Sequence, residues 1–264
     1  MDNIYILGDI HGSITPIRKF HEQQQYSNNT LILLGDAGIN YYLNKKDKKF
    51  KSKMEKFGIT YFIIRGNHEE RPSNLIKKDP NDWHTEIFWG NIVYVENDYP
   101  HIKYALDYPA IYKIPNGINI IKTLVIPGAY SVDKYYRIKR NWSWFKDEQL
   151  TKKEMDMANE LIKNNYFFDL VLSHTCPAIY EPTDLYLSII DQSLVDKTME
   201  RWLNQIEFKI SYQLWCWGHY HALRIYPRVG IRDKVMLFNE EYFNLLKYFN
   251  DPDRNPYDAL TKLI

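Results

Sequence analysis

The sequence has few cysteines, no long hydrophobic run and almost no net charge. Cys176 and Cys216 are the two cysteines among 264 residues, whereas a secreted scaffold that depends on disulfides would carry more. No stretch approaches the length of a transmembrane helix, and the start of the chain lacks the pattern of a signal peptide. We therefore expect reduced thiols, a cytoplasmic location and no membrane partner.

The balance of charge excludes a general attraction to nucleic acids or to anionic membranes. The chain has 34 Lys and Arg residues against 33 Asp and Glu residues, a formal net charge of +1. Any site for phosphate must therefore be built locally. The most basic stretch, residues 45–56, contains seven lysines. It is read most simply as the solvated face of an amphipathic helix, with a nucleic-acid groove as the alternative.

Five short apolar runs end abruptly in polar residues, which is typical of strands buried on both faces. They are residues 4–7 before GDIHG, 31–34 before GDAGIN, 61–64 before RGNHE, 170–172 before SHT, and 214–217 before GHYH. Helical patterns lie between the runs, with apolar side chains at helical spacing in residues 50–57 and 194–206. Thr151 to Glu154 has the pattern of a capping box. This alternation predicts an α/β fold.

The turn Pro115-Asn116-Gly117 separates two β-rich runs and predicts a hairpin, and with it a second, more antiparallel sheet. No internal repeat, low-complexity segment or linker divides the chain. We predict one domain over residues 1–250, followed by a polar, proline-containing tail over residues 251–264. The tail is expected to be either an appended helix or a partly mobile end.

Acidic, amide and imidazole side chains follow the five predicted strands. Ligands of open α/β sheets bind at the carboxyl ends of the strands, so we expect these side chains to meet in one crevice. They are Asp9, His11, Asp36, Asn67, His68, His174, His219 and His221. Mixed oxygen and nitrogen donors suit Mn²⁺, Fe²⁺, Zn²⁺ or Co²⁺ better than Ca²⁺ or Mg²⁺. The set contains more donors than one ion can bind, whereas two ions that share a carboxylate could bind nearly all of them.

Five short sequence motifs resemble those of the calcineurin-like metallophosphoesterase family. In chain order over residues 8–221 they are GDIHG, GDAGIN, RGNHE, SHTCP and GHYH. The resemblance implies two packed mixed β-sheets flanked by helices, with two divalent metal ions per chain. The implied ligands are two sets of three residues and a bridging carboxylate: Asp9, His11 and His221; Asn67, His174 and His219; and Asp36. In the implied mechanism a metal-bridging hydroxide attacks phosphorus in line with the leaving group, and His68 protonates the leaving oxygen.

The second motif departs from that of the serine/threonine phosphoprotein phosphatases. Those enzymes have an Asp and an Arg where this chain has Ile39 and Asn40. The Asp orients the general acid and the Arg holds the substrate phosphate, so His68 needs another partner here. The stretch PGAYSVDKYYR is similar to a subset of bacterial and phage members of the family. Replacements for the missing arginine are expected in and just after this stretch: Lys134, Arg137 and Arg140.

We therefore predict a binuclear metallophosphoesterase that acts on a small phosphomonoester, a phosphodiester or a nucleotide. Its location would be the cytoplasm of a bacterium, or of the host if a phage encodes the chain. Manganese is the expected metal, with iron, zinc or cobalt as alternatives. A phosphoprotein phosphatase or a nuclease of the same fold is an alternative activity. The alternative without catalysis is a metal-binding scaffold.

Overall fold

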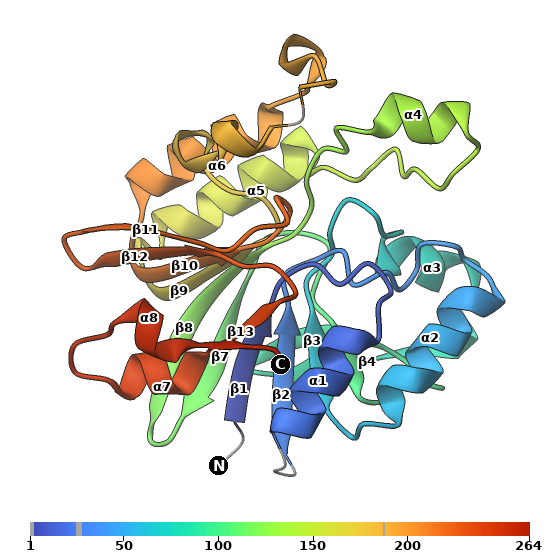
Figure 1. Cartoon of the computed structure of the whole chain (residues 1–264). Coiled ribbons are helices and arrows are strands. Elements are labelled where there is room, and N and C mark those ends of the chain that lie inside the picture. The colour runs from blue at the N-terminus through green and yellow to red at the C-terminus, as the bar shows by residue number, and fades with distance from the viewer. Residues whose placement is uncertain (1–2, 25–27, 187) are drawn as a thin grey trace.

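Two packed β-sheets, covered by helices on their outer faces, make up the computed structural model, which describes residues 3–24, 28–186 and 188–264 (Figure 1). Sheet A has eight strands in the order β14 (Leu260–Lys262), β13 (Glu241–Asn244), β1 (Asn3–Leu7), β2 (Asn29–Leu33), β3 (Thr60–Ile63), β6 (Ile102–Tyr104), β5 (Asn91–Glu96) and β4 (Trp83–Phe88). Sheet B has six strands in the order β11 (Arg224–Val229), β12 (Arg232–Met236), β10 (Ser211–Trp217), β9 (Phe167–Ser173), β8 (Asn119–Ile126) and β7 (Ala110–Asn116). The predicted fold class, two packed mixed sheets flanked by helices, is confirmed.

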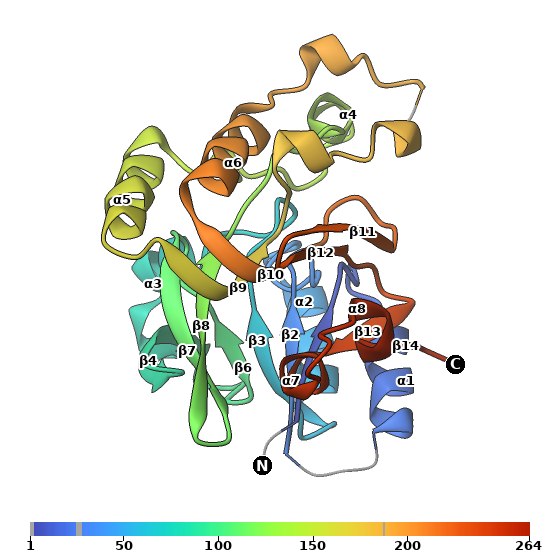
Figure 2. The same ribbon diagram turned by 90° about the vertical axis from the view of Figure 1, so that its left-hand side faces the viewer.

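Helices cover both outer faces of the two sheets (Figure 2). α1 (Thr15–Gln23) and α2 (Lys45–Glu55) bury side chains against sheet A, whereas α5 (Lys152–Lys163) and α6 (Thr198–Lys209) bury theirs against sheet B. Four short helices complete the described chain: α3 (Pro72–Lys78), α4 (Lys134–Lys139), α7 (Leu245–Asn250) and α8 (Pro256–Ala259). The order of layers is therefore helix, sheet, sheet, helix.

The near-continuous apolar strands follow from burial on two faces. In β1, Ile4 and Ile6 point into the core between the sheets, where they meet side chains from sheet B such as Leu170. The alternate residues Tyr5 and Leu7 join the second core, under α1 and α2. Successive side chains of a strand point to opposite faces, so a strand with a core on each side has no position for a polar residue until it ends.

The structure contains most of the local features that the sequence predicts. The five apolar runs lie in or overlap β1, β2, β3, β9 and β10. The capping box of α5 is present, with the Thr151 side chain accepting from the Glu154 backbone and the Glu154 side chain accepting from the Thr151 backbone. The hairpin of β7 and β8 turns at Gly117. Both cysteines are free and buried.

Two local expectations are wrong. The centre of sheet B is parallel, not antiparallel, because α5 and α6 are crossover helices that return the chain to the same end of the sheet, so that β8, β9 and β10 run parallel. The apolar stripe of residues 194–206 is helical only from Thr198 onwards, and Leu194 belongs to a separate short 3₁₀ turn.

The segment 251–264, which the sequence predicts to be a tail, contributes α8 and β14. β14 pairs antiparallel with β13, and Leu263 is buried in the core of sheet A. The division of the chain at residue 250 stays a prediction. Among the described residues, no helix combines the length and the apolar character that a membrane span requires.

Candidate metal centre

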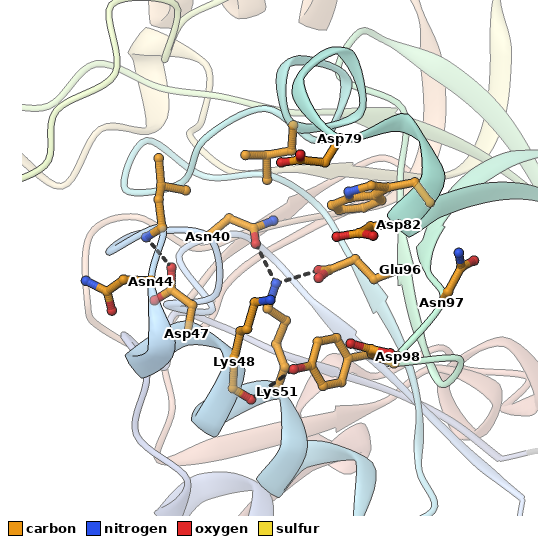
Figure 3. Close-up of a pocket in the computed structure, with 14 residues that line it drawn as sticks. Asn40, Asn44, Asp47, Lys48, Lys51, Asp79, Asp82, Glu96, Asn97 and Asp98 are labelled. Atoms are coloured by element: carbon orange, nitrogen blue, oxygen red, sulfur yellow. Dashed lines mark hydrogen bonds and ion pairs between the residues drawn. The ribbon is translucent and has the colours of Figure 1, made fainter.

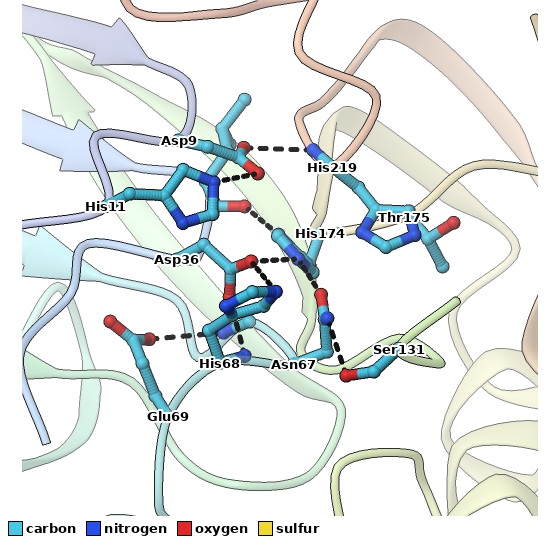
Figure 4. Close-up of polar contacts among 12 residues, drawn as sticks. Asp9, His11, Asp36, Asn67, His68, Glu69, Ser131, His174, Thr175 and His219 are labelled. Carbon is cyan, nitrogen blue, oxygen red and sulfur yellow. Dashed lines mark hydrogen bonds and ion pairs between the residues drawn. The ribbon is translucent and has the colours of Figure 1, made fainter. Parts of the chain in front are cut away.

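The candidate metal centre lies where the central parallel strands of both sheets end (Figure 4). Sheet A contributes the loops after β1, β2 and β3, and sheet B contributes those after β9 and β10. The eight predicted site residues follow these strands in the order Asp9, His11, Asp36, Asn67, His68, His174, His219 and His221. The crevice is therefore shared by two sheets, which places donors on opposite walls.

The backbone of these loops is strained at the predicted ligands. Four of them have a positive φ although they are not glycine: His11 at 46°, Asp36 at 47°, His219 at 69° and His221 at 53°. Residues with a Cβ atom adopt this left-handed conformation rarely, and such strain is held mainly at functional sites. The surrounding sheets thus fix the direction of each side chain at a cost in local backbone energy.

Two motif glycines allow the carboxylates to pack against the backbone. A Cβ atom at Gly66 would lie 2.0 Å from Asp36 Oδ1, and one at Gly218 would lie 2.1 Å from Asp9 Oδ1. Any other residue at these positions would displace a carboxylate. This contact explains why RGNHE and GHYH each carry a glycine directly before the predicted ligands.

Asp9, His11 and His221 converge at one end of the crevice. Their donor atoms all lie within 4.8 Å of one another, and the Nε2 atoms of the two imidazoles are 2.8 Å apart. Asp9 Oδ1 accepts the backbone N–H of His219 at 2.9 Å. Its other oxygen, Oδ2, is buried without any hydrogen-bond partner among the described residues. A bare carboxylate oxygen beside two ring nitrogens fits a metal ion, because a cation would satisfy all three atoms at once.

Asp36, Asn67 and His174 form the other end of the crevice. His174 Nδ1 lies 2.7 Å from the carbonyl oxygen of Leu34, and its Nε2 lies 2.8 Å from Asn67 Oδ1 and 3.6 Å from Asp36 Oδ2. A histidine that donates from Nδ1 to a carbonyl keeps Nε2 free for a metal. Oxygen atoms of Asn67 and Asp36 then face that nitrogen, so this second group of donors fits a cation too.

The electrostatics of the crevice favour positive charge. Burial works against the charged form of His174, yet Asp36 and Asp9 outweigh it and raise the pKa of His174 to about 9. Burial would raise the pKa of Asp36, but His68 and His174 hold it well below its usual range. The two buried carboxylates therefore stay ionised, and a proton on His174 supplies the charge that a metal would supply.

His219 differs from His174 because burial, and not a carboxylate, dominates its surroundings. Its ring lies 5.0 Å from that of His174, centroid to centroid. Burial, together with the charge of His174, lowers the pKa of His219 to about 3. The neutral imidazole is the form that ligates metals, so His219 is ready to act as a ligand at neutral pH.

His68 lies at the rim of the crevice. Its backbone N–H donates to Asp36 Oδ1 at 2.8 Å, and its Nε2 is 3.7 Å from Asp36 Oδ2. The ring stacks on Tyr41, with centroids 6.0 Å apart. Burial lowers the pKa of His68, and the opposing effect of Asp36 does not cancel it. The His68 ring thus contacts the aromatic ring of Tyr41 as well as that of His11, whose centroid is 5.1 Å away.

Glu69 is a residue of the site that the sequence reasoning missed. It is 3% exposed, and its two oxygens accept the backbone N–H groups of Gly38 at 3.0 Å and Gly66 at 3.2 Å. Burial, followed by the charge of Asp36, raises the pKa of Glu69 to about 7. Glu69 is the last residue of the motif RGNHE, and this position was the feature of the sequence that could have identified it. The side chain ties the loop after β2 to the loop after β3, and so fixes Asp36 against Asn67.

The three basic residues predicted to hold phosphate occupy different surroundings. Arg137 is 1% exposed, lies with its guanidinium carbon 5.5 Å from the centre of the Tyr41 ring, and donates to Ser131 Oγ at 3.1 Å. Its charge also acts on His68, which places it beside the crevice. Lys134 instead lies over the ring of Trp144, and Arg140 over that of Tyr136.

Comparison with known proteins supports this architecture. A family model described as calcineurin-like phosphoesterase matches residues 3–223. Among solved structures, TT1561 of Thermus thermophilus is similar at 11% identity and a TM-score of 0.52, over 100% of this chain and 99% of that chain. No curated protein matches the sequence significantly.

Two further solved structures belong to proteins with a named activity. A dimetal phosphatase from Danio rerio shares 7% identity at a TM-score of 0.50, over 92% of this chain and 94% of that one. A phosphopantetheinyl hydrolase from Mycobacterium tuberculosis shares 13% identity at a TM-score of 0.50, over 100% and 96% of the two chains. These identities show a common fold and nothing finer. Because the family model spans most of the sequence, the chain belongs to the calcineurin-like phosphoesterase family, whose members are metal-dependent hydrolases.

Proposed function

We propose that the chain hydrolyses small phosphoric esters, either monoesters, diesters or nucleotides, at a centre that holds two metal ions. The position of Asp36 carries this proposal. Its carboxylate lies within 4.8 Å of donor atoms of His11 and His68 in one group, and of Asp9 and His174 in another. One carboxylate that faces both ends of the crevice is what a shared, bridging ligand requires.

In this proposal Asp36 would be shared by two ions, and three further residues would hold each ion. They are Asp9, His11 and His221 for one ion, and Asn67, His174 and His219 for the other. The ions, when bound, would activate water and neutralise the charge of the reacting phosphoryl group. Manganese is the metal that we propose, although iron, zinc and cobalt accept the same mixture of donors.

Arg137 and His68 are the residues proposed to act on the ester itself. The Nη2 atom of Arg137 is buried and has no hydrogen-bond partner among the described residues. A buried, unpaired guanidinium N–H is costly, and a substrate phosphate would satisfy it. His68 would transfer a proton to the leaving oxygen, since its Nε2 atom lies at the rim of the crevice, 3.7 Å from Asp36 Oδ2.

The structure of the second motif favours a small ester over a phosphoprotein. Ile39 is 1% exposed and packs in the core under α1 and α2. The side chain of Asn40 accepts a hydrogen bond from the buried Lys51 at 2.8 Å. Neither position presents a charged group to a substrate, in contrast to the phosphoprotein phosphatases that the motif resembles.

Hydrolysis of chromogenic esters tests this function. Protein stripped of metal and reloaded with Mn²⁺ would be given 4-nitrophenyl phosphate and its diester analogue, beside the variants Asp36→Asn and His68→Ala. We expect metal-dependent turnover that falls by about 10²-fold or more in each variant, because one loses the shared ligand and the other the proton donor. Asp36→Asn should also hold less metal, whereas His68→Ala should keep two ions per chain. A protein that binds no metal under these conditions would contradict the proposal.

A further inference from the structure

A groove of about 460 Å³ leads away from the metal centre along α2. His11 and His68 line one end of it, and Tyr41 lies between this end and the helix. Its other wall carries three lysines of α2, Lys46, Lys49 and Lys53. The volume lies within the range of small-molecule sites. The groove therefore continues the crevice in one direction, past the residue proposed to protonate the leaving group.

The three lysines share one face of α2 and have no carboxylate partner. They are spaced at i, i+3 and i+7, which places them on one side of a helix. Among the described residues, no carboxylate lies within ion-pair distance of any of them. Lys51, on the neighbouring face, is different: it lies in another cavity and contacts Glu96 Oε1 at 2.5 Å and Asn40 Oδ1 at 2.8 Å (Figure 3). Lys51 is thus paired with a carboxylate, whereas the three groove lysines are not. Lys46 lies instead over the ring of Tyr42, 4.4 Å from its centre.

The acidic residue that lines the groove does not neutralise these lysines. Asp47 is 3% exposed, and its two carboxylate oxygens accept the backbone N–H groups of Tyr42 at 3.2 Å and Leu43 at 2.7 Å. Burial raises the pKa of Asp47, which reflects the cost of its charge there. The groove consequently offers positive charge over the distance from Lys46 to Lys53, roughly 10 Å along the helix axis.

We propose that this groove binds a second phosphate group, carried by the leaving group of the substrate. The proposal rests on the proposed function, because His68 at the mouth of the groove assigns this side to the leaving group. Hydrolysis of such a monoester consumes water, breaks the bond between phosphorus and the leaving oxygen, and returns a proton to that oxygen. The products are inorganic phosphate and an alcohol that keeps its own phosphate in the groove. The substrate class is a phosphate monoester whose leaving group carries a second, separate phosphate group, and nucleotides serve as its probes.

A matched pair of substrates tests the groove. Adenosine 3′-phosphate and adenosine 3′,5′-bisphosphate differ only in the second phosphate, and a short 5′-phosphorylated single-stranded oligonucleotide provides a longer chain of phosphates. The groove variant is Lys46→Ala/Lys49→Ala/Lys53→Ala. The control is Lys45→Ala/Lys48→Ala/Lys56→Ala, which removes the same charge from exposed positions outside the groove.

We expect the wild type to have a KM for the bisphosphate that is about tenfold below that for the monophosphate, as three modest surface interactions would produce together. This ratio should fall towards one in the groove variant, and towards one in the wild type at high salt. The control variant should keep most of the difference in KM between the two substrates. A lower KM for the oligonucleotide than for the bisphosphate would support the groove and identify a nucleic-acid end as the source of the second phosphate.

Calorimetric binding to the metal-free protein separates failure of the groove from failure of the proposed function. If no substrate turns over, the hydrolase proposal fails for these esters. Preferential binding of the bisphosphate that is lost in the groove variant alone would still support the groove. Equal affinity of the wild type for both nucleotides, or equal losses in the groove and control variants, would overturn it.

Discussion

At the residue scale, the metal centre depends on side chains that are not ligands. The amide of Asn67 turns its oxygen towards His174 while its nitrogen donates to Ser131 Oγ at 2.9 Å. Ser131 in turn donates to the buried Glu148 at 2.6 Å and accepts from Arg137. This chain of hydrogen bonds determines which end of the amide faces the centre, and it also joins the metal centre to the arginine proposed to hold phosphate.

The variant Ser131→Ala tests this chain. Removal of the hydroxyl frees the Asn67 amide to rotate and leaves Glu148 with one fewer donor, so we expect the affinity for the ion held by Asn67 to fall about tenfold. Titration of metal-free protein with Mn²⁺ measures it. Ser52→Ala, on the exposed surface of α2, is the control and should bind metal as the wild type does. Unchanged affinity in Ser131→Ala would show that the amide is held by other contacts.

The sequence predicted which residues meet in the crevice, whereas it did not predict the residues that hold them in place. Each proposed ligand follows a recognisable strand within a few positions, so a local pattern and a resemblance suffice to propose it. Ser131 is 64 residues from Asn67, and no sequence pattern around a serine in a loop indicates which distant residue it contacts. Tyr41 stands directly after the second motif, yet its stacking on His68 depends on the fold of two separate loops.

At the scale of elements, the capping box shows that a local signal can predict where a helix begins without predicting where it packs. Thr151 and Glu154 mark the first turn of α5, and both hydrogen bonds of the capping box form. The same Glu154 also accepts from Arg71 Nη1 at 2.5 Å, in the segment before α3. The cap therefore also joins a helix on sheet B to the loops after β3, a connection that no local pattern contained.

Loss of the cap should destabilise the whole chain measurably. In Thr151→Ala, one N–H of the first turn loses its acceptor, and we expect the free energy of unfolding to fall by about 1 kcal/mol. The midpoint of thermal unfolding should drop by about 2–4 °C for a chain of this size. Lys153→Ala, an exposed neighbour in the same turn, is the control. A drop no larger than that of the control would mean that water replaces the cap at little cost.

At the scale of the whole molecule, the pairing of the sheets is what the sequence could not specify by itself. Strand-like runs and helical stripes predicted an α/β fold and the hairpin at residues 115–117 predicted a second sheet, but the packing of the two sheets on each other came from the resemblance. The parallel centre of sheet B requires β8, β9 and β10 to meet across α5 and α6, at sequence separations that periodicity does not record. Packing of the helices against sheet B also buries acidic side chains, and this affects the stability of the fold as pH changes.

Glu200, on α6, is one of these buried acids, with a side chain that is 3% exposed and one carboxylate oxygen that has no hydrogen-bond partner among the described residues. Burial raises its pKa to about 7, although Thr175 donates to the other oxygen at 2.8 Å. Because the folded state keeps a proton that the unfolded state has lost, the unfolded state binds fewer protons between pH 4.5 and 7. This group therefore lowers the free energy of unfolding as pH rises through that range, by roughly 3 kcal/mol.

The variant Glu200→Gln should remove this dependence, because its amide oxygen can accept from Thr175 without ever taking a charge. We expect the variant to gain stability relative to the wild type as pH rises from about 5 to about 8, in chemical unfolding measured across that range. Glu69 and His174 also titrate in the folded state, so the difference between variant and wild type is the quantity to follow. Glu160→Gln, an exposed position on α5, should give a difference that does not change with pH. A flat difference for Glu200→Gln as well would mean that Glu200 is ionised in the folded protein, with its charge compensated by Lys197 or by water.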